Sequence, residues 1–596
     1  MNTSDFLLSR LREWGVKRVF GYPGDGINGI AGAFSRAEDD DGGVEFIQVR
    51  HEEMAALMAT AHAKFTGEIG VCLATSGPGA IHLLNGLYDA KMDKTPVVAI
   101  VGQSSTLALG GDYQQEVDLQ QLFEDVSEYV ATVASPPAIR HVVDRAFRIA
   151  QGMRGVCTII VPKDIQEQDY ADPPRKHNTL RSSVGYSRPI VVPASQDLQR
   201  AADVLNAGER VAMLVGAGAL HASEEVLAVA DLLGGCVAKA LLGKATLPDE
   251  IPWVTGTIGL LGTKQSAEMM NECDTLLMVG SAFPYAEFLP KEGQARGVQI
   301  DIDPRYLGIR FPSEVNLIGD SADTLRALIP FLRAKADRSW RESIIRVREA
   351  FEEDERARAH MDTDRLNPQR VFYELNEHLP DNCIVTADAG TAANWSARNL
   401  KMRRGMKYSL SGGLATMGSA VPYAIAAKFA YPDRVTIACT GDGAMQMNGN
   451  AELLTVMKYW KQWSDPRIIF LVLNNEDLNQ VTWEMRVESG DAKYEASQNL
   501  PSFSYAAYAE SIGMRGIRVE AAPHVEHAWS EAFESDRPVL IEAVVDPAVQ
   551  QLPPHITLEQ AHGLFSALVH GDPERAAVIK ESIRSVLTGI LPGRPR

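Results

Sequence analysis

Residues 434–444 read RVTIACTGDGA and residues 468–475 read IIFLVLNN, and these two stretches decide the fold of the chain. The apolar runs 434–438 and 468–473 each predict a buried strand. Strand, helix and strand in this order predict two parallel strands joined by a crossover. The Gly-Asp-Gly turn and the Asn pair then meet at the carboxyl edge of one sheet, where open parallel sheets bind ligands. The helix is expected from apolar side chains at helical spacing, namely Leu453, Leu454, Val456, Met457 and Trp460.

The residue types at this edge predict a magnesium-diphosphate site. Gly441 and Gly443 allow the backbone to approach a phosphate closely, and the helix that follows presents its N-terminus to the anion. Asp442 offers a charged oxygen ligand and Asn475 a neutral one. A Mg²⁺ ion held by one or two protein oxygens keeps its other positions for phosphate oxygens and water. The competing interpretation is an ordinary glycine turn.

Gly-Asp-Gly followed by Asn-Asn in this context resembles the diphosphate motif of thiamine diphosphate (ThDP) enzymes. The resemblance implies that Asp442 and Asn475 bind the metal and that Asp477 lends its backbone carbonyl. It also places Gly441, Gly443 and Ala444 at the diphosphate. The 30 residues from 444 to 473 are a few more than the family usually has. We expect the extra length in the polar turn 460–467.

Composition favours a globular protein with several domains. The chain has 596 residues, which predicts three or four domains. A net charge of −19 argues against a nucleic-acid partner. Six cysteines without a CxxC motif suit a reducing compartment, and neither a signal region nor a membrane-spanning run is visible. We therefore expect a cytoplasmic protein.

The first third, residues 1–180, contains a literal GxGxxG at Gly24, Gly26 and Gly29, with Glu45 about twenty residues later. A dinucleotide fingerprint is therefore one interpretation, although three glycines in a strand-to-helix turn are common. The ThDP resemblance instead places Gly24, with Ser76 from the turn TSGPG (75–79), at the cofactor.

Residues 48–59 read QVRHEEMAALMA and predict a strand that turns into an alanine-rich helix. Glu52 in the first turn could serve only the helix dipole. His51 and Glu52 do not continue to HExxH, which excludes a zinc protease of that type. In ThDP enzymes a His-Glu pair stands here, and the match implies that Glu52 contacts N1′ of the cofactor pyrimidine. Glu52 would then favour the imino tautomer, whose N4′ removes the C2 proton.

The segment HLLNGLYDA (82–90) resembles pyruvate oxidases, within the branch that also holds acetolactate synthases. His82 belongs to this match, but a single His on a helix is more often a packed residue than a catalytic one. The branch usually has Phe-Gln-Glu where this chain has Gln114-Gln115-Glu116. Gln114 thus alters the acceptor pocket beside Tyr113, and Gln115 is the candidate for a polar contact to the bound adduct.

The middle third, residues 190–345, follows a linker at 169–195 that is rich in Pro, Ser and basic residues. It resembles the FAD-binding domain of pyruvate oxidases, in which backbone turns hold the diphosphate and an acidic strand end holds ribose. The alternative is a structural α/β domain that has lost its ligand. The implied FAD residues are Gly216, Gly218, Thr257, Gly280, Phe283, Asp301 and Asp303.

The last third places a charged helix, 339–358, before a domain that spans residues 365–550, and we expect this helix to be a solvated connector. VTADAGT (385–391) resembles the second diphosphate loop of the family, with Gly390 and Thr391 at the cofactor. Leu414 and Met417 match the loop whose large apolar residue bends the cofactor, although a Met that fills the core is an alternative. Val481 would line the substrate side. Glu484 matches a Glu near the active site of pyruvate oxidases, and an exposed Glu on a helix is the alternative.

The tail, residues 551–596, begins with QLPPHITLEQAHGL, which resembles the end of quinone-linked bacterial pyruvate oxidases. That relative touches the membrane with an amphipathic C-terminal helix. The alternative, a helix packed on its own subunit, is slightly favoured. The apolar stripe comprises Ile579, Ile583, Val586, Leu587, Ile590 and Leu591, with Lys580 and Arg584 beside it.

These features together predict an α/β fold of three doubly wound parallel-sheet domains: pyrimidine-binding, FAD-type and diphosphate-binding. The resemblance implies a ThDP-, Mg²⁺- and FAD-dependent oxidase of a 2-oxo acid, with pyruvate as the first candidate and quinone or O₂ as acceptor. It further implies a homodimer at least, with a tetramer expected, since the family builds each site from two subunits. The alternatives are an acetolactate-synthase-like carboligase, a non-oxidative decarboxylase, and a cofactor-binding paralogue without activity.

Overall fold

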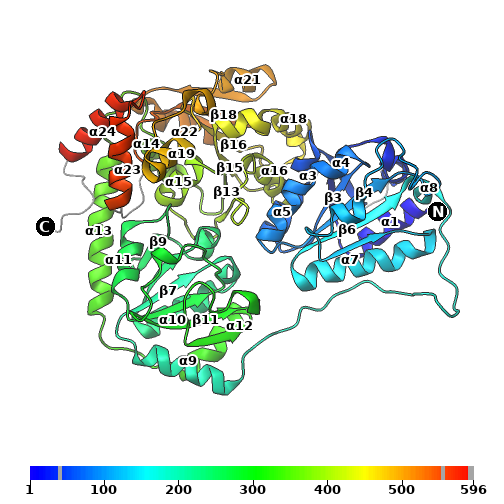
Figure 1. Cartoon of the computed structure of the whole chain (residues 1–596), viewed down its shortest axis with the longest axis horizontal. Helices are drawn as coiled ribbons and strands as arrows, with labels where there is room; N and C mark the ends of the chain where they lie inside the picture. The colour runs from blue at the N-terminus through cyan, green and yellow to red at the C-terminus, as the bar shows by residue number, and fades with distance from the viewer. Residues whose placement is uncertain (38–42, 552–557, 588–596) are drawn as a thin grey trace.

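The computed structural model describes residues 1–37, 43–551 and 558–587. Figure 1 shows three α/β domains, with the first in blue and cyan, the second in green, and the third in yellow and orange. Each contains one six-stranded sheet whose neighbouring strands all run parallel. Helices cover both faces of each sheet, so the predicted doubly wound α/β class is confirmed.

The first sheet has the strand order β2-β1-β3-β4-β6-β5. Every residue of β3, β4 and β6 is buried, as expected for parallel strands covered on both faces. One face packs against α1, α2 and α7, and the other packs against α3 and α5. The elements are α1 Thr3–Glu13, β1 Arg18–Gly21, α2 Asn28–Arg36, β2 Glu45–Gln48, α3 Glu52–Thr66, β3 Gly70–Ala74, α4 Pro78–His82, α5 Leu84–Met92, β4 Val97–Gln103, α6 Leu119–Leu122, β5 Tyr129–Thr132, α7 Ile139–Met153, β6 Val156–Pro162 and α8 Lys163–Glu167.

The second sheet has the order β12-β11-β10-β7-β8-β9 and follows a long connection. Residues 168–194 form neither helix nor strand. Figure 1 shows this segment as a long trace that runs from the first domain to the second. The elements are α9 Ser195–Ala207, β7 Val211–Val215, α10 Ser223–Leu233, β8 Cys236–Lys239, β9 Val254–Thr257, α11 Lys264–Glu272, β10 Thr275–Val279, β11 Arg296–Asp301, β12 Val315–Ile318 and α12 Ser321–Leu328.

Helix α13 (Ser339–Ala359) differs from the solvated connector that its charge pattern predicted. Ile344, Phe351 and Glu355 are buried because the helix packs against α11 of the second domain and α14 of the third. The interpretation of this helix as solvated was therefore wrong for one of its faces.

The third sheet has the order β14-β13-β15-β16-β18-β17. β15 and β16 are parallel neighbours, with Gly441 opposite Leu473. This register brings the Gly-Asp-Gly turn beside the Asn pair, as the sequence predicted. The elements are α14 Pro368–His378, β13 Ile384–Ala387, α15 Thr391–Asn399, β14 Lys407–Ser409, α16 Ala420–Ala430, β15 Thr436–Gly441, α17 Asp442–Ala444, α18 Asn450–Tyr459, β16 Ile468–Asn474, α19 Asn479–Glu484, α20 Glu495–Gln498, α21 Tyr505–Ser511, β17 Arg515–Val519, α22 Val525–Phe533 and β18 Val539–Val544.

The first and third domains share one hydrophobic core, which is built around α3 and α16. The contact is lined by small side chains, which let the two helices approach closely. Ala55, Ala59, Ala424 and Ala427 are fully buried there. Figure 1 shows α3 and α16 lying together where the first and third domains meet.

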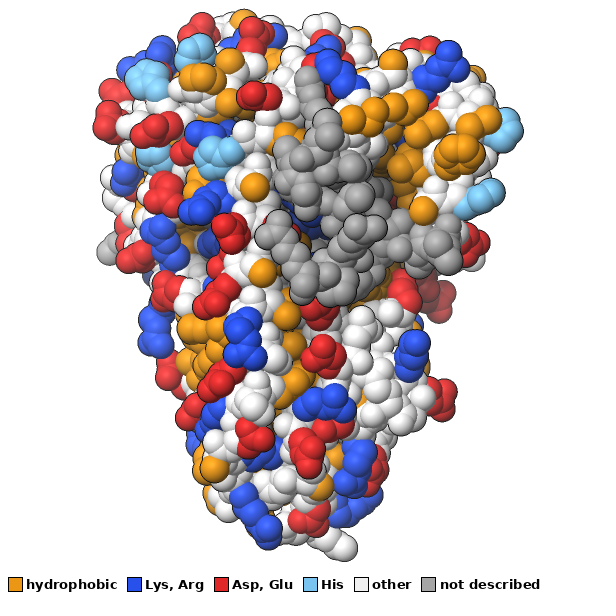
Figure 2. Space-filling view, turned by 90° about the vertical axis from the view of Figure 1, so that its left-hand side faces the viewer, with side chains coloured by type: hydrophobic (Ala, Val, Ile, Leu, Met, Phe, Trp, Pro, Cys, Tyr) orange, Lys and Arg blue, Asp and Glu red, His pale blue; other side chains and the backbone are white. Residues whose placement is uncertain are grey.

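The C-terminal helix α23 (Leu558–Val569) packs against the π-helical turn Met485–Ser489 after α19. Helix α24 (Arg575–Leu587) adds Val578 to a small apolar cluster with Trp483 and Val487. Val578 is fully buried, while Ile579 and Ile583 are 43% and 53% exposed. Figure 2 shows the face that carries these helices, where hydrophobic side chains gather beside the grey residues. Of the predicted apolar stripe, the side chains of Val586, Leu587, Ile590 and Leu591 lie outside the described part.

Across the described ranges, no helix combines the length and apolar character that a membrane crossing requires.

Candidate functional site

Asp442 occupies the first position of α17, directly after β15. Its Oδ2 accepts the backbone N–H groups of Asn475 at 2.9 Å and Glu476 at 2.6 Å, and Oδ1 accepts that of Gly443 at 2.9 Å. The residue is only 3% exposed, and this burial raises the pKa of Asp442 to about 7. A buried carboxylate without a cation is costly, so the donor set fits a divalent metal.

The residues after β16 complete this donor set. Asn475 accepts the N–H of Asp477 with Oδ1 at 3.1 Å. The carboxylate of Asp477 is bound by Lys493 at 3.1 Å and by Thr482 at 3.0 Å, so its side chain already has partners in the protein. These partners leave the side chain of Asp477 less suited to a metal than its backbone carbonyl, whose predicted metal role stays a prediction.

A second turn lies beside this one, at the carboxyl end of β13. Gly390 has φ 88° and ψ −150°, a conformation that favours glycine. A Cβ added at Gly390 would meet only Gln480, at 3.9 Å, so the turn faces open space. Thr391, 8% exposed, begins α15. An open turn at a helix N-terminus is the shape that an anion needs.

The sequence analysis missed Asp388, which ties this turn to the loop containing Met417. Its Oδ1 accepts the N–H groups of Ala389 at 2.9 Å and Gly418 at 2.8 Å, and its Oδ2 accepts that of Ala420 at 3.1 Å. Asp388 is fully buried, which raises its pKa to about 6. The available signal was an acidic residue directly after a strand and before a run of small residues.

The loop 412–418 lies against both the Gly-Asp-Gly turn and the first domain. The methyl carbon of Met417 is 3.3 Å from the position that a Cβ would occupy on Gly443. The N–H groups of Gly412 and Gly413 donate to the carboxylate of Asp93 at 3.0 and 2.6 Å. Leu414, on the same loop, is half-buried. The structure thus brings Met417 to the predicted cofactor turn.

Glu52 is the first residue of α3 and is 7% exposed. Its Oε2 lies 3.0 Å from Nδ1 of His82, and Gly79 leaves room for its Oε1. The ring of His51 stacks on that of His82 with centroids 4.4 Å apart. The side chain of His82 is 43% exposed and has partners in both Glu52 and His51, so a packed residue and a residue of the site both stay open as interpretations.

The turn after β3 brings Ser76 and Gln115 together. Ser76 Oγ lies 3.2 Å from Oε1 of Gln115, within hydrogen-bond distance. Gln115 has φ 64°, in the left-handed region, and packs against Gly77. Because Gly79 of the same turn adjoins Glu52, these residues belong to the neighbourhood of Glu52.

The glycines of the GxGxxG segment are used for packing inside the first domain. A Cβ on Gly24 would lie 2.5 Å from Thr75, one on Gly26 2.5 Å from Ser76, and one on Gly29 2.6 Å from Gln166. These close contacts explain why all three positions are glycine, and a bound dinucleotide is not needed to explain them. Gly24 lies against Thr75, in the turn that also carries Ser76, and the predicted cofactor contact of both residues stays a prediction.

Helix α19 carries the two residues predicted for the substrate side. Val481 is 47% exposed, and Glu484 accepts Gln480 Nε2 at 3.0 Å on the exposed face. Thr482 and Trp483 are buried and hold the helix to the domain. The helix therefore presents Val481 outward, away from its own core.

The predicted FAD residues meet at the carboxyl edge of the second sheet, where β7, β10 and β11 are neighbours. Gly216 and Gly218 pack tightly against Gly280, where any Cβ would meet backbone atoms. Asp301 is 8% exposed and accepts the N–H of Asp303, and burial raises its pKa. Asp303 is paired with Arg305 at 2.7 Å. A buried acid at a strand end fits a ribose hydroxyl, so this edge is compatible with FAD.

The remaining two FAD candidates have partners within the protein. Phe283 is 6% exposed and stacks edge-on against Tyr285, with ring centroids 5.6 Å apart. The hydroxyl of Thr257 donates to the carbonyl of Ala397 in the third domain at 2.9 Å. Thr257 thus contributes to the contact between domains.

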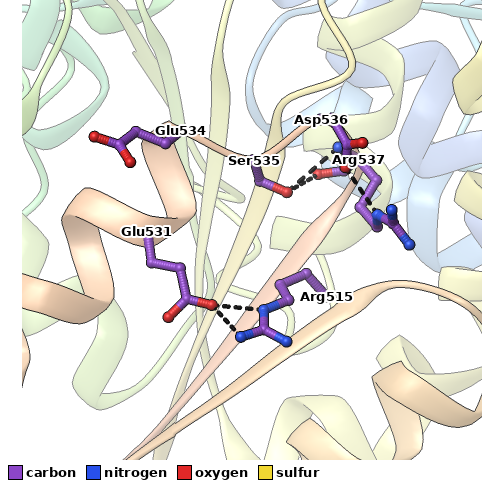
Figure 3. Close-up of a pocket in the computed structure, with 6 residues that line it drawn as sticks. All are labelled: Arg515, Glu531, Glu534, Ser535, Asp536 and Arg537. Carbon is purple, nitrogen blue, oxygen red and sulfur yellow. Dashed lines mark hydrogen bonds and ion pairs between the residues drawn. The ribbon is translucent and has the colours of Figure 1, made fainter.

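A hollow of about 440 Å³ lies at the opposite edge of the third sheet (Figure 3). Its rim includes the ion pair of Arg515 with Glu531. Because β17 begins at Arg515, this hollow is at the amino edge and away from the Gly-Asp-Gly turn. We assign it no role in the reaction.

Comparisons with known proteins agree with this geometry. Residues 1–122 match the family described as thiamine pyrophosphate enzyme, N-terminal TPP binding domain. Residues 198–328 match its central domain, and residues 388–543 match its C-terminal TPP binding domain. The chain belongs to the thiamine pyrophosphate enzyme family, in the branch of pyruvate oxidases and acetolactate synthases.

Three relatives illustrate the likeness. A Bacillus subtilis protein, YdaP, named as thiamine pyrophosphate-containing, is 38% identical over 93% of both chains. The acetolactate synthase isozyme 2 large subunit of Escherichia coli is 32% identical over 92% of this chain and 96% of its own. The pyruvate oxidase of Lactiplantibacillus plantarum is 29% identical over 90% of this chain and 87% of its own. The protein is therefore a ThDP-dependent enzyme of this branch.

Proposed function

We propose that this enzyme oxidatively decarboxylates a 2-oxo acid, with pyruvate as the leading candidate, and passes the electrons through FAD to a quinone or O₂. The observation that carries the oxidase assignment is the contact of His82 with Glu52 at 3.0 Å. His82 belongs to the segment that resembles pyruvate oxidases, and this contact places it beside the predicted catalytic acid.

The third domain would hold the metal and the diphosphate. Asp442, Asn475 and the carbonyl of Asp477 would bind Mg²⁺, with Gly390 and Gly443 at the diphosphate. ThDP, when bound, supplies the carbon nucleophile and the positive ring that takes up the electrons left by decarboxylation. Glu52 would hold a proton at the pyrimidine edge, and its burial beside His82 suits that role.

Val481 and Gln115 are the proposed contacts on the substrate side, with Glu484 at the outer end of α19. Gln114, at the position where the resemblance implies a Phe, offers a polar group where an aromatic ring would exclude water. We therefore expect the acceptor pocket to differ from that of a typical relative.

The test is the visible spectrum of the purified protein with ThDP and Mg²⁺, before and after anaerobic pyruvate. A flavin spectrum that bleaches supports the oxidase. A flavin that stays oxidised, with a carbon–carbon coupled product, supports the acetolactate-synthase-like alternative, which the 32% identity to such a synthase favours. If no flavin is bound, the FAD assignment fails and a non-oxidative decarboxylase replaces it.

We also propose a homodimer at least, with a tetramer expected. Leu107 is 95% exposed and Tyr113 62% exposed on the loop that carries Gln115, as an uncovered interface would be. Light scattering after size-exclusion chromatography measures the assembly, and a monomeric active enzyme would contradict it. Attachment to a membrane through Ile579 and Ile583 of α24 is a separate proposal, tested by vesicle co-sedimentation.

A further inference from the structure

Strand β2, which leads to Glu52, is the edge strand of the first sheet. The N–H groups of Glu45 and Val49 point inward, since they donate to β1 and its flank at 2.9 and 3.1 Å. Successive N–H groups of a strand alternate in direction, so those of Gln48 and Arg50 point away from the sheet. An edge of this kind must find its acceptors elsewhere.

Helix α18 of the third domain supplies both acceptors. The hydroxyl of Tyr459 accepts the N–H of Gln48 at 2.9 Å, and Oε2 of Glu452 accepts the N–H of Arg50 at 3.1 Å. Lys458 adds a bond from its Nζ to the side chain of Gln48 at 2.7 Å. Side chains of one helix thus complete the edge of a sheet in another domain.

Apolar packing reinforces this contact. Ile47 from β2 and Leu453 and Val456 from α18 are fully buried in the same core cluster. Glu452 lies among them with no measurable exposure, and a carboxylate in such a place is retained only where it has a strong partner. Burial raises the pKa of Glu452 to about 7.

The position of α18 connects this contact to the Gly-Asp-Gly turn. Asp442 begins a continuous helical run of α17, the π-helical turn Met445–Gly449 and α18. Arg50 is followed at once by His51, the N-cap of α3, and by Glu52. One helical run therefore joins the predicted metal ligand of the third domain to the backbone that sets the position of Glu52.

We propose that Glu452 is a positioning residue, which fixes the turn 50–52 and so orients the carboxylate of Glu52 for proton transfer at the cofactor. The inference rests on the role of Glu52 in the proposed function. It assigns no chemistry to Glu452 itself, which acts only through the N–H of Arg50. Misplacement of a reacting group by about 1 Å can cost on the order of a hundredfold in rate.

The experiment measures exchange of the C2 proton of bound ThDP for deuterium, by acid quench and NMR, in the full-length protein with Mg²⁺. Glu452→Ala is expected to slow the exchange about tenfold or more while ThDP affinity stays close to wild type. Glu452→Gln keeps a neutral acceptor for the N–H of Arg50 and should restore most of the rate.

Tyr459→Phe is the matched control, because it removes the neighbouring bond from the same helix at Gln48, four residues before Glu52. Tyr459→Phe should lower thermal stability to an extent similar to Glu452→Ala, and its rate of C2 proton exchange should equal that of the wild type. Equal slowing in Glu452→Ala and Tyr459→Phe, or no slowing in Glu452→Ala, would overturn the proposal.

Exchange needs neither substrate nor flavin, so failure of the oxidase assignment would leave this test intact. Glu52→Gln is the reference for the acid itself. If Glu52→Gln leaves exchange unchanged, the role of Glu52 fails, and with it the basis for assigning a positioning role to Glu452.

Discussion

Asp442 shows how one buried side chain organises a ligand site. Its two oxygens accept three N–H groups from the ends of two strands, and these bonds offset only part of the cost of burial. The remaining cost appears as the raised pKa. A metal ion bound to the same carboxylate would offset this remaining cost of burial, which gives a reason for an acid at this position.

Replacement of Asp442 by Asn tests this account. The amide oxygen can still accept the N–H groups of Asn475 and Glu476, but the NH₂ group cannot accept that of Gly443, and the charge that attracts Mg²⁺ is lost. Removal of a buried charge offsets the loss of this one bond. We expect Mg²⁺-dependent ThDP binding to weaken by about tenfold or more, as for other metal-site substitutions, while thermal stability without cofactor is unchanged or higher. Isothermal titration and a melting curve measure the two effects. Asp536→Asn, at the exposed hollow on the opposite edge of the sheet, is the control, and a loss of stability in Asp442→Asn would contradict the account.

Among the elements, the C-terminal helices depend on a buried ion-pair network. Arg486, in the π-helical turn after α19, pairs with Asp572 at 2.8 Å, and both side chains are fully buried. Lys493 pairs with Glu574 at 2.6 Å and also with Asp477 of the predicted metal loop at 3.1 Å. The segment that contains α23 and α24 is thus connected to the predicted metal loop through Lys493, while Arg486 binds the same segment to the turn after α19.

Replacement of Arg486 by Ala should release this segment. The change leaves Asp572 buried and unpaired, which costs about 3–5 kcal/mol of local stability. Hydrogen exchange by mass spectrometry should show faster exchange in residues 558–587 than in wild type. Arg515→Ala, which removes an exposed pair with Glu531, should change little. Unchanged protection of 558–587 in Arg486→Ala would show that apolar packing alone holds the segment.

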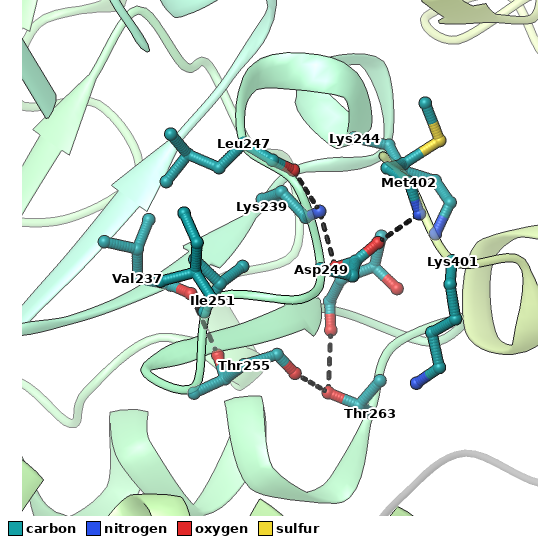
Figure 4. A network of polar contacts seen from close by, with 12 residues as sticks. Val237, Lys239, Lys244, Leu247, Asp249, Ile251, Thr255, Thr263, Lys401 and Met402 are labelled. Atoms are coloured by element: carbon teal, nitrogen blue, oxygen red, sulfur yellow. Dashed lines mark hydrogen bonds and ion pairs between the residues drawn. The ribbon is translucent and has the colours of Figure 1, made fainter. Parts of the chain in front are cut away.

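For the whole molecule, the contact between the second and third domains contains buried lysines. Figure 4 shows Lys239 paired with Asp249, whose carboxylate also accepts the N–H of Met402. Lys244 donates to the carbonyl of Ala397 at 2.9 Å and is 2% exposed. The pKa of Lys244 is lowered to about 7, chiefly by burial. The neighbouring cations Lys239 and Lys401 also lower this pKa, whereas Asp249 raises it.

This lowered pKa predicts a pH dependence of stability. Between about pH 7 and the ordinary lysine value near 10.4, the unfolded chain binds a proton at Lys244 that the folded chain does not. The free energy of unfolding should therefore gain from this group as pH rises through that window, by at most about 1.4 kcal/mol per unit. Urea unfolding of wild type and Lys244→Met at pH 7, 8 and 9 measures it. The variant should show a smaller slope, and parallel slopes would contradict the assignment.

The repeating local patterns of apolar and glycine residues could be interpreted from the sequence without a structure. The apolar runs of β15 and β16, the helical spacing of α18 and the glycines between them specify a strand-helix-strand unit, because periodicity and turn chemistry act over a few residues. The fold class and the candidates Glu52, Asp442 and Asn475 followed from that unit and from family likeness. The family is confirmed, whereas the roles of the individual residues remain predictions.

Contacts between segments that are distant in the sequence could not be predicted from it. Asp388, the contact of His82 with Glu52 and the bond from Arg50 to Glu452 join residues from 30 to 402 positions apart. The burial of one face of α13 also depends on two domains that the local charge pattern does not reveal.

The sequence by itself determined that this protein has three parallel-sheet domains of the ThDP type, because local periodicity and one short motif encode these features. Only the tertiary structure decided which side chains surround Glu52 and how the third domain reaches it. The physical reason is that burial, pKa and hydrogen-bond partners depend on residues that are distant in the sequence and become neighbours only when the chain folds.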